Sequence, residues 1–529
     1  MANVELPGWQ LPLDYHYKNT TGFFPHVLEH EDIGDAGRLC TYREIFIMRV
    51  VNAITDKRHW ERKIFHETIT AKWREKIAAS GKDITPSMID WIMDEVKWKV
   101  ENYSAITHIV VFDSGVVKSD TAISEKLQNA LRDGVRELED STLERTTIQA
   151  LMTKLWTCIG QGSILPVPGQ EAYSHAWTGH KQYSCRFQWL PCDVDLLGDG
   201  SCAIVSYINN LHPQQNVRLY HVIEEIIAEA IPLWNTTLTC MKGDYWRIQY
   251  HSVEYEEAID DDFSKYKPPG AVKVPEPGKF FPPQFRSSDR VNLYEFGNTG
   301  LQIIVKLANI ELTPEKPEYQ GGSWHVEGQL NEHICATAIY YYDSENITSS
   351  SLSFRQRAST YCMSDLYPEQ DRHDFLQKVY GFPEETLGNG STNVTQELGS
   401  VVTKEGRLLT FANILQHRVS PFSLADRSKP GHRKILALFL VDPHLRIISS
   451  SNVPPQREDW AVERERSIRL ALQSLPQELK DAVCDNLDAP CMTMGEAEEI
   501  RLELMKERSS VAAEQNRNFE TGDFFLYEH

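Results

Sequence analysis

A short motif before a long apolar run constrains this chain more than any other feature. The motif is Tyr319-Gln-Gly-Gly-Ser-Trp-His325-Val-Glu327-Gly, and the apolar run that follows it is Ile334–Tyr342. The Gly-Gly pair indicates a turn, and the run indicates a buried strand. In extended backbone the side chains at positions i and i+2 point to the same face. The His325 imidazole and the Glu327 carboxylate can therefore reach one cation together.

A histidine and a carboxylate are two members of the 2-His-1-carboxylate triad, which leaves open coordination positions on non-haem Fe(II). The best candidate for the third ligand is His417, which follows His325 by 92 residues (417 − 325). The rival is His432, with Arg446 then binding the cosubstrate. We favour His417, because His432 directly precedes Arg433 and adjacent residues of a strand point to opposite faces.

Arg433 opens an apolar strand in which Ile435, Ala437 and Phe439 share its face. A guanidinium among apolar neighbours offers two parallel hydrogen bonds to a carboxylate. We expect that carboxylate to be the distal one of 2-oxoglutarate, whose keto-acid end would chelate the iron. Upstream, Tyr207 and Asn209 stand beside a turn and are further candidates for contact with the cosubstrate.

Four residues near the motif are candidates for the substrate pocket. Ile339 and Tyr341 share the parity of the two motif ligands if the strand is regular, although core packing explains them equally well. Tyr319 and Trp324 flank the motif and either orient the ligands or fill the rim of the sheet.

The order of elements predicts an α+β fold with a double-stranded β-helix, or jelly-roll, core. Residues 1–180 form a mainly helical region that packs on the core, with a capping box at Thr41 and a helix start at Pro86. Residues 181–456 form the jelly-roll catalytic domain, because short alternating strands recur there, and residues 344–400 form a polar insertion within it. Residues 457–529 form C-terminal helices.

Composition disfavours several partners and compartments. The formal net charge is −21, and no basic patch offsets it, so we expect no nucleic-acid partner. No apolar run is long enough to span a membrane, and the N-terminus lacks the features of a secretory signal. The ten cysteines contain no C-x-x-C pair. We therefore expect reduced thiols and a cytoplasmic protein, with the oligomeric state left open.

The H-x-E motif, a distal histidine followed by Arg-Val, and an arginine opening an apolar strand together resemble the Fe(II)/2-oxoglutarate-dependent oxygenase superfamily. More narrowly, four phrases resemble the fungal DUF4246 family: Tyr207-Ile-Asn-Asn-Leu-His-Pro213, Trp324-His-Val-Glu-Gly328, Phe354-Arg355 and Gln416-His-Arg-Val-Ser-Pro-Phe422. The resemblance implies Fe(II), 2-oxoglutarate and O₂ as cofactor and cosubstrates. It also implies oxidation of an unactivated C–H bond in a small amino acid such as L-valine, by hydroxylation or aziridine-type ring closure, in fungal secondary metabolism.

Two other function classes stay open at this stage. The acidic ligand is Glu rather than Asp, which resembles the JmjC branch and allows a protein hydroxylase or demethylase. A non-catalytic jelly-roll binding protein is the second alternative. Zinc hydrolysis of the zincin type is disfavoured, since the H-E-x-x-H motif does not occur.

Overall fold

The structure is a computed structural model. It describes residues 24–28, 38–81, 83–141, 153–154, 184, 187–243, 245–256, 270–359, 366–369, 372–383, 392–453, 455–460, 466, 469–470, 472–485, 492–522 and 524.

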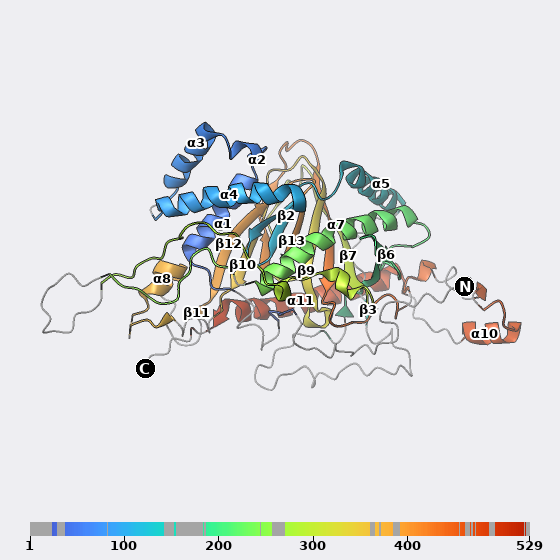
Figure 1. Cartoon of the computed structure of the whole chain (residues 1–529). Coiled ribbons are helices and arrows are strands. Elements are labelled where there is room, and N and C mark those ends of the chain that lie inside the picture. Colours follow the sequence, from blue (N-terminus) through green and yellow to red (C-terminus); the bar gives the residue numbers. More distant parts are fainter. Residues whose placement is uncertain are drawn as a thin grey trace, which may run out of the picture.

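The centre of the molecule is a large antiparallel sheet of eight strands, in a mixed α/β arrangement (Figure 1). The strands lie in the order β1 (Ile109–Phe112), β2 (Val116–Ser119), β13 (Leu408–Ala412), β9 (Ile334–Glu345), β16 (Gly431–Val441), β7 (Leu301–Leu312), β5 (Cys192–Leu196) and β6 (Cys202–Ile204). The neighbouring central strands β9 and β16 thus come from distant parts of the chain. Two of the eight strands, β1 and β2, come from the region that the sequence analysis assigned to a mainly helical N-terminus.

Both faces of this sheet are buried, which explains why β9 is a nearly continuous apolar run. Even-numbered residues of β9, such as Ala338 and Tyr340, belong to a core covered by helices α5 (Glu125–Ser141) and α7 (Val217–Lys242). Odd-numbered residues, such as Ile339, belong to a second core on the opposite face. In Figure 1, α7 crosses the strands of the large sheet.

The second core lies between the large sheet and a smaller antiparallel sheet. The smaller sheet has the order β12 (Thr395–Val402), β10 (Ser351–Arg357) and β14 (Gln416–Val419). Leu352, Phe354 and Val401 of the small sheet share this core with Leu409 and Phe439 of the large one. A third pairing joins β8 (Glu318–Tyr319) to β15 (Phe422–Ser423).

The small sheet changes the interpretation of residues 344–400, which the sequence analysis treated as a polar insertion. That range contains β10 and β12, two of the three strands of the small sheet. Between β10 and β12 the described residues include helix α8 (Asp374–Tyr380). The sequence analysis read this range as a polar insertion because alternate residues of the two strands, such as Ser351, Ser353 and Ser400, are polar.

The N-terminal helices are α1 (Tyr42–Thr55), α2 (Trp60–Lys63), α3 (Glu67–Ala78) and α4 (Pro86–Ile106). The expected capping box is present at the start of α1: Thr41 accepts a hydrogen bond from the backbone of Glu44, and the Glu44 side chain accepts one in return. Pro86 occupies the first turn of α4, as expected. This helical layer packs on β1 and β12 at one end of the sheets.

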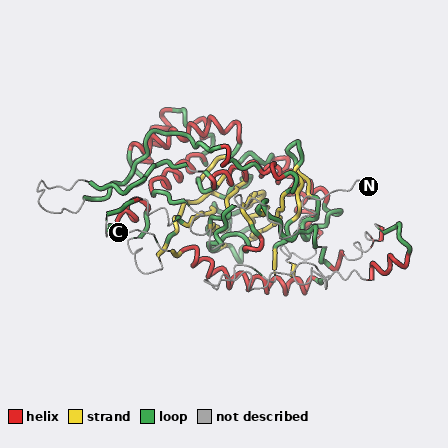
Figure 2. The backbone as a smooth tube through the Cα atoms, turned by 60° about the horizontal axis from the view of Figure 1, so that its bottom comes forward, coloured by secondary structure: helices red, strands yellow, loops and turns green. Residues whose placement is uncertain are grey.

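In the described part of the C-terminal region, helices α10 (Gln477–Asp485) and α11 (Met494–Glu520) follow the sheets. In both Figure 1 and Figure 2, α11 runs along the bottom of the molecule, beneath the strands. Its Leu504 and Phe519 reach the core between the two sheets. None of the helices in the described ranges is long and apolar enough to cross a membrane.

Candidate metal centre

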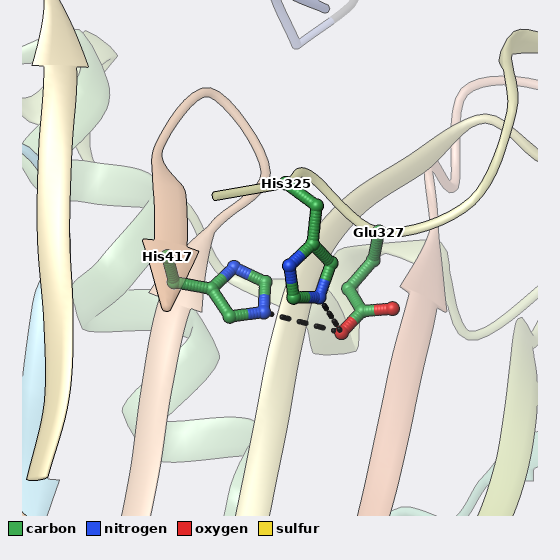
Figure 3. A group of neighbouring side chains, drawn as sticks. All are labelled: His325, Glu327 and His417. Atoms are coloured by element: carbon green, nitrogen blue, oxygen red, sulfur yellow. Dashed lines mark ion pairs between the residues drawn. The ribbon is translucent and has the colours of Figure 1, made fainter. Parts of the chain in front are cut away.

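His325, Glu327 and His417 converge on one point at the edge of the core between the sheets (Figure 3). One nitrogen from each imidazole and one carboxylate oxygen all lie within 4.8 Å of one another. The Oε1 atom of Glu327 is 3.3 Å from Nε2 of His417 and 3.9 Å from Nε2 of His325. The structure thus brings together the three residues predicted from the sequence.

The backbone positions the two histidines directly opposite each other. His325 and His417 form an antiparallel bridge and exchange both hydrogen bonds, with N···O distances of 3.2 and 3.0 Å. Residues paired in this way present their side chains on the same face. The imidazole centroids are accordingly only 4.3 Å apart.

A backbone carbonyl sets the tautomer of His325. Nδ1 of His325 lies 2.9 Å from the carbonyl oxygen of Ser323. A carbonyl can only accept, so Nδ1 carries the proton and Nε2 keeps a free lone pair on the side of Glu327. This outer contact is the kind that orients metal-binding histidines.

The charge states of the cluster suit a cation. Burial raises the pKa of Glu327, but the hydrogen bond from His417 and the nearby imidazoles outweigh it and bring the pKa to about 2. Burial, together with the neighbouring His417, lowers the pKa of His325 below its usual value. An ionised carboxylate and a neutral imidazole are the forms that ligate metals.

The cluster is enclosed on one side and open on the other. The side chain of His417 is 3% exposed and that of Glu327 is 12% exposed, whereas that of His325 is 42% exposed. The rings of Phe411 and Phe354 pack against His417, with centroid distances of 4.7 and 6.5 Å. A ligand can therefore approach from the His325 side without displacing the core.

Asn413 holds the backbone of Glu327 in place, a role that the sequence analysis missed. Its Oδ1 accepts from the Glu327 N–H at 2.9 Å, and its Nδ2 donates to the carbonyls of Glu327 and Ile334, both at 2.9 Å. Asn413 is 2% exposed. The available signal was an amide inside an otherwise apolar segment that leads to His417.

Arg433 lies on the face of β16 that belongs to the core between the sheets, as its parity predicted. It is 3% exposed, donates from Nη1 to Ser350 Oγ at 2.7 Å, and lies over the ring of Phe422 at 4.6 Å. Among the described residues no carboxylate comes within 4 Å of it, and its Nε has no hydrogen-bond partner there. Burial lowers the pKa of Arg433, with Tyr341 and Tyr319 opposing that effect. A buried cation in this state lacks a counter-charge.

The four substrate-pocket candidates fall into two groups. Ile339 and Tyr341 face the core between the sheets, and both are almost fully buried there. Tyr319 packs on Phe422 in a tilted arrangement, with 5.1 Å between the ring centroids, and Arg433 lies over the same Phe422 ring. Trp324 contacts two guanidinium groups, those of Arg355 at 4.7 Å and Arg418 at 4.5 Å from its ring centroid.

The rival ligand His432 does not belong to the cluster. Its Nε2 is 3.1 Å from Oδ2 of Asp343. Arg446, which the rival scheme would use as the cosubstrate anchor, is paired with the buried carboxylate of Asp193.

Tyr207 and Asn209 follow β6, which is the edge strand four places from β9 in the large sheet. The Tyr207 hydroxyl donates to the carbonyl of Val453 at 2.8 Å. Their predicted contact with the cosubstrate stays a prediction.

Lys306 is a second residue that the sequence analysis did not single out. It lies in the middle of β7, directly opposite Ala437 of β16, on the face of the core between the sheets. Its Nζ stands 5.3 Å from the ring centroid of Trp189, which itself stacks on Phe439. A lysine inside the apolar run Leu301-Gln-Ile-Ile-Val-Lys-Leu was the available signal.

The fold and the cluster define a mixed α/β protein with large antiparallel sheets and a candidate two-histidine, one-carboxylate metal centre. The chain belongs to the DUF4246 family: the model described as "Protein of unknown function (DUF4246)" matches residues 86–464, and the model of its N-terminal domain matches residues 6–76. Both Asn413 and all three members of the cluster lie within the first match. No curated protein matches the chain.

Two solved structures show a distant likeness. One is the selenomethionine-labelled Fe(II)/(alpha)ketoglutarate-dependent dioxygenase TqaL, at 11% identity over 70% of this chain and 94% of that one, with a TM-score of 0.25. The other is IDO from Bacillus thuringiensis, at 11% identity over 27% of this chain, with a TM-score of 0.15. The second match spans 48% of that protein's own length. Because both TM-scores are below 0.5, neither likeness bears on the function proposed below.

Proposed function

We propose that this chain is a non-haem Fe(II)- and 2-oxoglutarate-dependent oxygenase that oxidises a C–H bond of a small molecule, such as the amino acid L-valine. The observation that carries the proposal is the convergence of His325, Glu327 and His417. Two imidazoles and one carboxylate on one side of a cation are the ligand set that leaves positions open for a cosubstrate and O₂.

The residues present fit an iron ion. Glu327 is a buried carboxylate whose partners within 4 Å, among the described residues, are the two imidazoles alone. A buried carboxylate is costly unless a cation compensates it. The ion would be held by His325 Nε2, His417 Nε2 and Glu327 Oε1. The Ser323 carbonyl would keep His325 oriented, and Asn413 would do the same for Glu327.

Arg433 supplies independent support for a dicarboxylate cosubstrate. It is buried in the same core and lacks a carboxylate partner among the described residues, so an incoming carboxylate would provide its missing counter-charge. Ser350, which already accepts from its Nη1, would fix the direction of the guanidinium. When bound, iron and 2-oxoglutarate together would supply an oxidant able to attack an unactivated C–H bond.

The strand order supports a jelly-roll core for this site. From β9 onwards the chain passes back and forth between the two sheets: β9 of the large sheet is followed by β10 and β12 of the small one, then by β13 (large), β14 (small) and β16 (large). The His325 segment joins the small-sheet side through its bridge to His417. Such alternation between two facing sheets is the connectivity of a jelly roll, and we place the catalytic domain there.

Anaerobic absorption spectroscopy tests the proposal. The Fe(II)·2-oxoglutarate complex should show a metal-to-ligand charge-transfer band in the wild type, and the band should disappear in His325→Ala and in Glu327→Ala. Release of succinate in the presence of O₂ and L-valine, or another free amino acid, would then identify the substrate. A metal-loaded wild type without the band, or a band that survives both substitutions together, would refute the assignment.

A further inference from the structure

The core that holds the candidate metal centre contains a second cationic side chain, Lys306, which the proposed cofactors leave without a role. β7 pairs with β16 so that Lys306 is opposite Ala437, and β16 pairs with β9 so that Ala437 is opposite Ile339. Residues directly opposite in neighbouring strands share a face. Lys306 therefore projects from the same face as Ile339, towards the interior that the two sheets enclose.

Packing against aromatic rings positions the side chain of Lys306 on this face. Its ammonium group lies over Trp189, and the stack of Trp189 on Phe439 forms an apolar wall beside it. Packing on Trp189 thus positions the lysine on the inner face of the large sheet.

No described carboxylate lies within 4 Å of Lys306, which is half-buried. Under the proposed function, the charges of Fe(II), Glu327, 2-oxoglutarate and Arg433 cancel one another. Lys306 then adds one positive charge, and no described carboxylate within 4 Å compensates it. A partly desolvated ammonium without a counter-ion favours binding of an anion.

We propose that Lys306 binds a carboxylate of the primary substrate and thereby selects small carboxylic acids, amino acids included, over their uncharged analogues. This inference rests on the proposed function, since it names the residue that would bind the anionic group of the oxygenase's substrate in the core between the sheets. Arg433 and Lys306 lie on different strands and are four residue pairs apart in the register of β16 and β7, because Arg433 is opposite Ile310. Two separate cations allow the cosubstrate and the substrate to be held by different groups.

The first measurement separates substrate binding from cosubstrate binding. In Lys306→Met, the anaerobic Fe(II)·2-oxoglutarate band should form with a dissociation constant within about twofold of wild type. Its formation in wild type and variant shows that the oxygenase assignment holds independently of the new inference. If Lys306→Met abolishes 2-oxoglutarate binding while Arg433→Met retains it, then Lys306 is the cosubstrate anchor and the inference is wrong.

The second measurement uses calorimetric titration of the anaerobic Fe(II)·2-oxoglutarate complex with L-amino acids, L-valine first. The matched probe is the amino alcohol of the acid that binds, L-valinol for L-valine, in which a hydroxymethyl group replaces the carboxylate. Wild type should bind the acid about tenfold or more tightly than the alcohol. Lys306→Met should weaken binding of the acid by a similar factor, so that the dissociation constants of the acid and the alcohol become similar. Lys306→Arg should restore part of the preference for the acid.

Lys434→Met is the control, because Lys434 belongs to the opposite face of β16 and pairs with Glu139 at 2.8 Å. It should leave both probes unchanged. Equal loss of affinity for the acid and the alcohol in Lys306→Met would indicate a packing defect and would overturn the inference. A wild type that forms the charge-transfer band yet binds no amino acid would also overturn it, while leaving the proposed function intact.

Discussion

Asn413→Ala tests how the protein positions Glu327, the proposed acidic ligand of the candidate metal centre. The Asn413 amide makes three hydrogen bonds of 2.9 Å, two to the backbone of Glu327 and one to the carbonyl of Ile334. It is 2% exposed, so water does not replace these bonds when the amide is removed.

The expected cost follows from those three bonds. A typical intramolecular hydrogen bond contributes about 1 kcal/mol net, and a buried backbone group left without a partner costs about as much or more. Asn413→Ala should therefore destabilise the protein by roughly 2–4 kcal/mol. Since Glu327 would lose its backbone support, affinity for a divalent metal should also fall by about 10-fold to 100-fold, the range seen when outer contacts of metal ligands are removed.

Two assays separate stability from positioning. Urea denaturation, followed by circular dichroism and fluorescence, gives the loss of stability. Titration with Co(II) under conditions where the variant is fully folded gives the loss of metal affinity. Asn309→Ala is the matched control, because Asn309 makes a hydrogen bond to Glu139 on the other side of the large sheet. If folded Asn413→Ala binds Co(II) within about twofold of wild type, Asn413 does not position Glu327, and the reasoning fails.

Three further predictions address the cosubstrate anchor, the rival ligand and the response to acid. Arg433→Met should retain metal but raise the dissociation constant for 2-oxoglutarate by about tenfold or more, as measured by the anaerobic charge-transfer band; unchanged binding would exclude Arg433 as anchor. His432→Ala should leave metal and 2-oxoglutarate binding within about twofold of wild type, since His432 pairs with Asp343, and loss of metal would reinstate it as a ligand. Burial raises the pKa of Asp120, but its hydrogen bonds and ion pair with Arg407 prevail and bring the pKa from 3.8 to about 2. Because the folded-state pKa lies below the unfolded one, this carboxylate stabilises the fold above about pH 4 and ceases to do so as the pH falls to about 2. Because the Asp120 side chain is 33% exposed, its contribution to the free energy of unfolding is about 1 kcal/mol. Urea denaturation between pH 5 and pH 2 should therefore show a smaller pH dependence of stability in Asp120→Asn than in wild type. An equal pH dependence in both proteins would contradict this prediction.

The sequence alone determined the local geometry of the site. Covalent geometry makes side chains alternate along any extended strand, so the shared face of His325 and Glu327, and the inward direction of Arg433, follow without knowledge of the partner strands. The capping box at the start of α1 and the proline in the first turn of α4 were equally local, because each is decided by groups within one helical turn.

Only the tertiary structure decided which distant residues complete the site. The bridge between His325 and His417 spans 92 positions, and the register that places them opposite each other depends on how the whole core between the sheets packs. For the same reason β10 and β12 were hidden in an apparent insertion, and the contact of Asn413 with Glu327 was not visible along the chain. Periodicity assigns a residue to a face of its own strand, whereas the neighbour across the sheet is selected by burial summed over many residues.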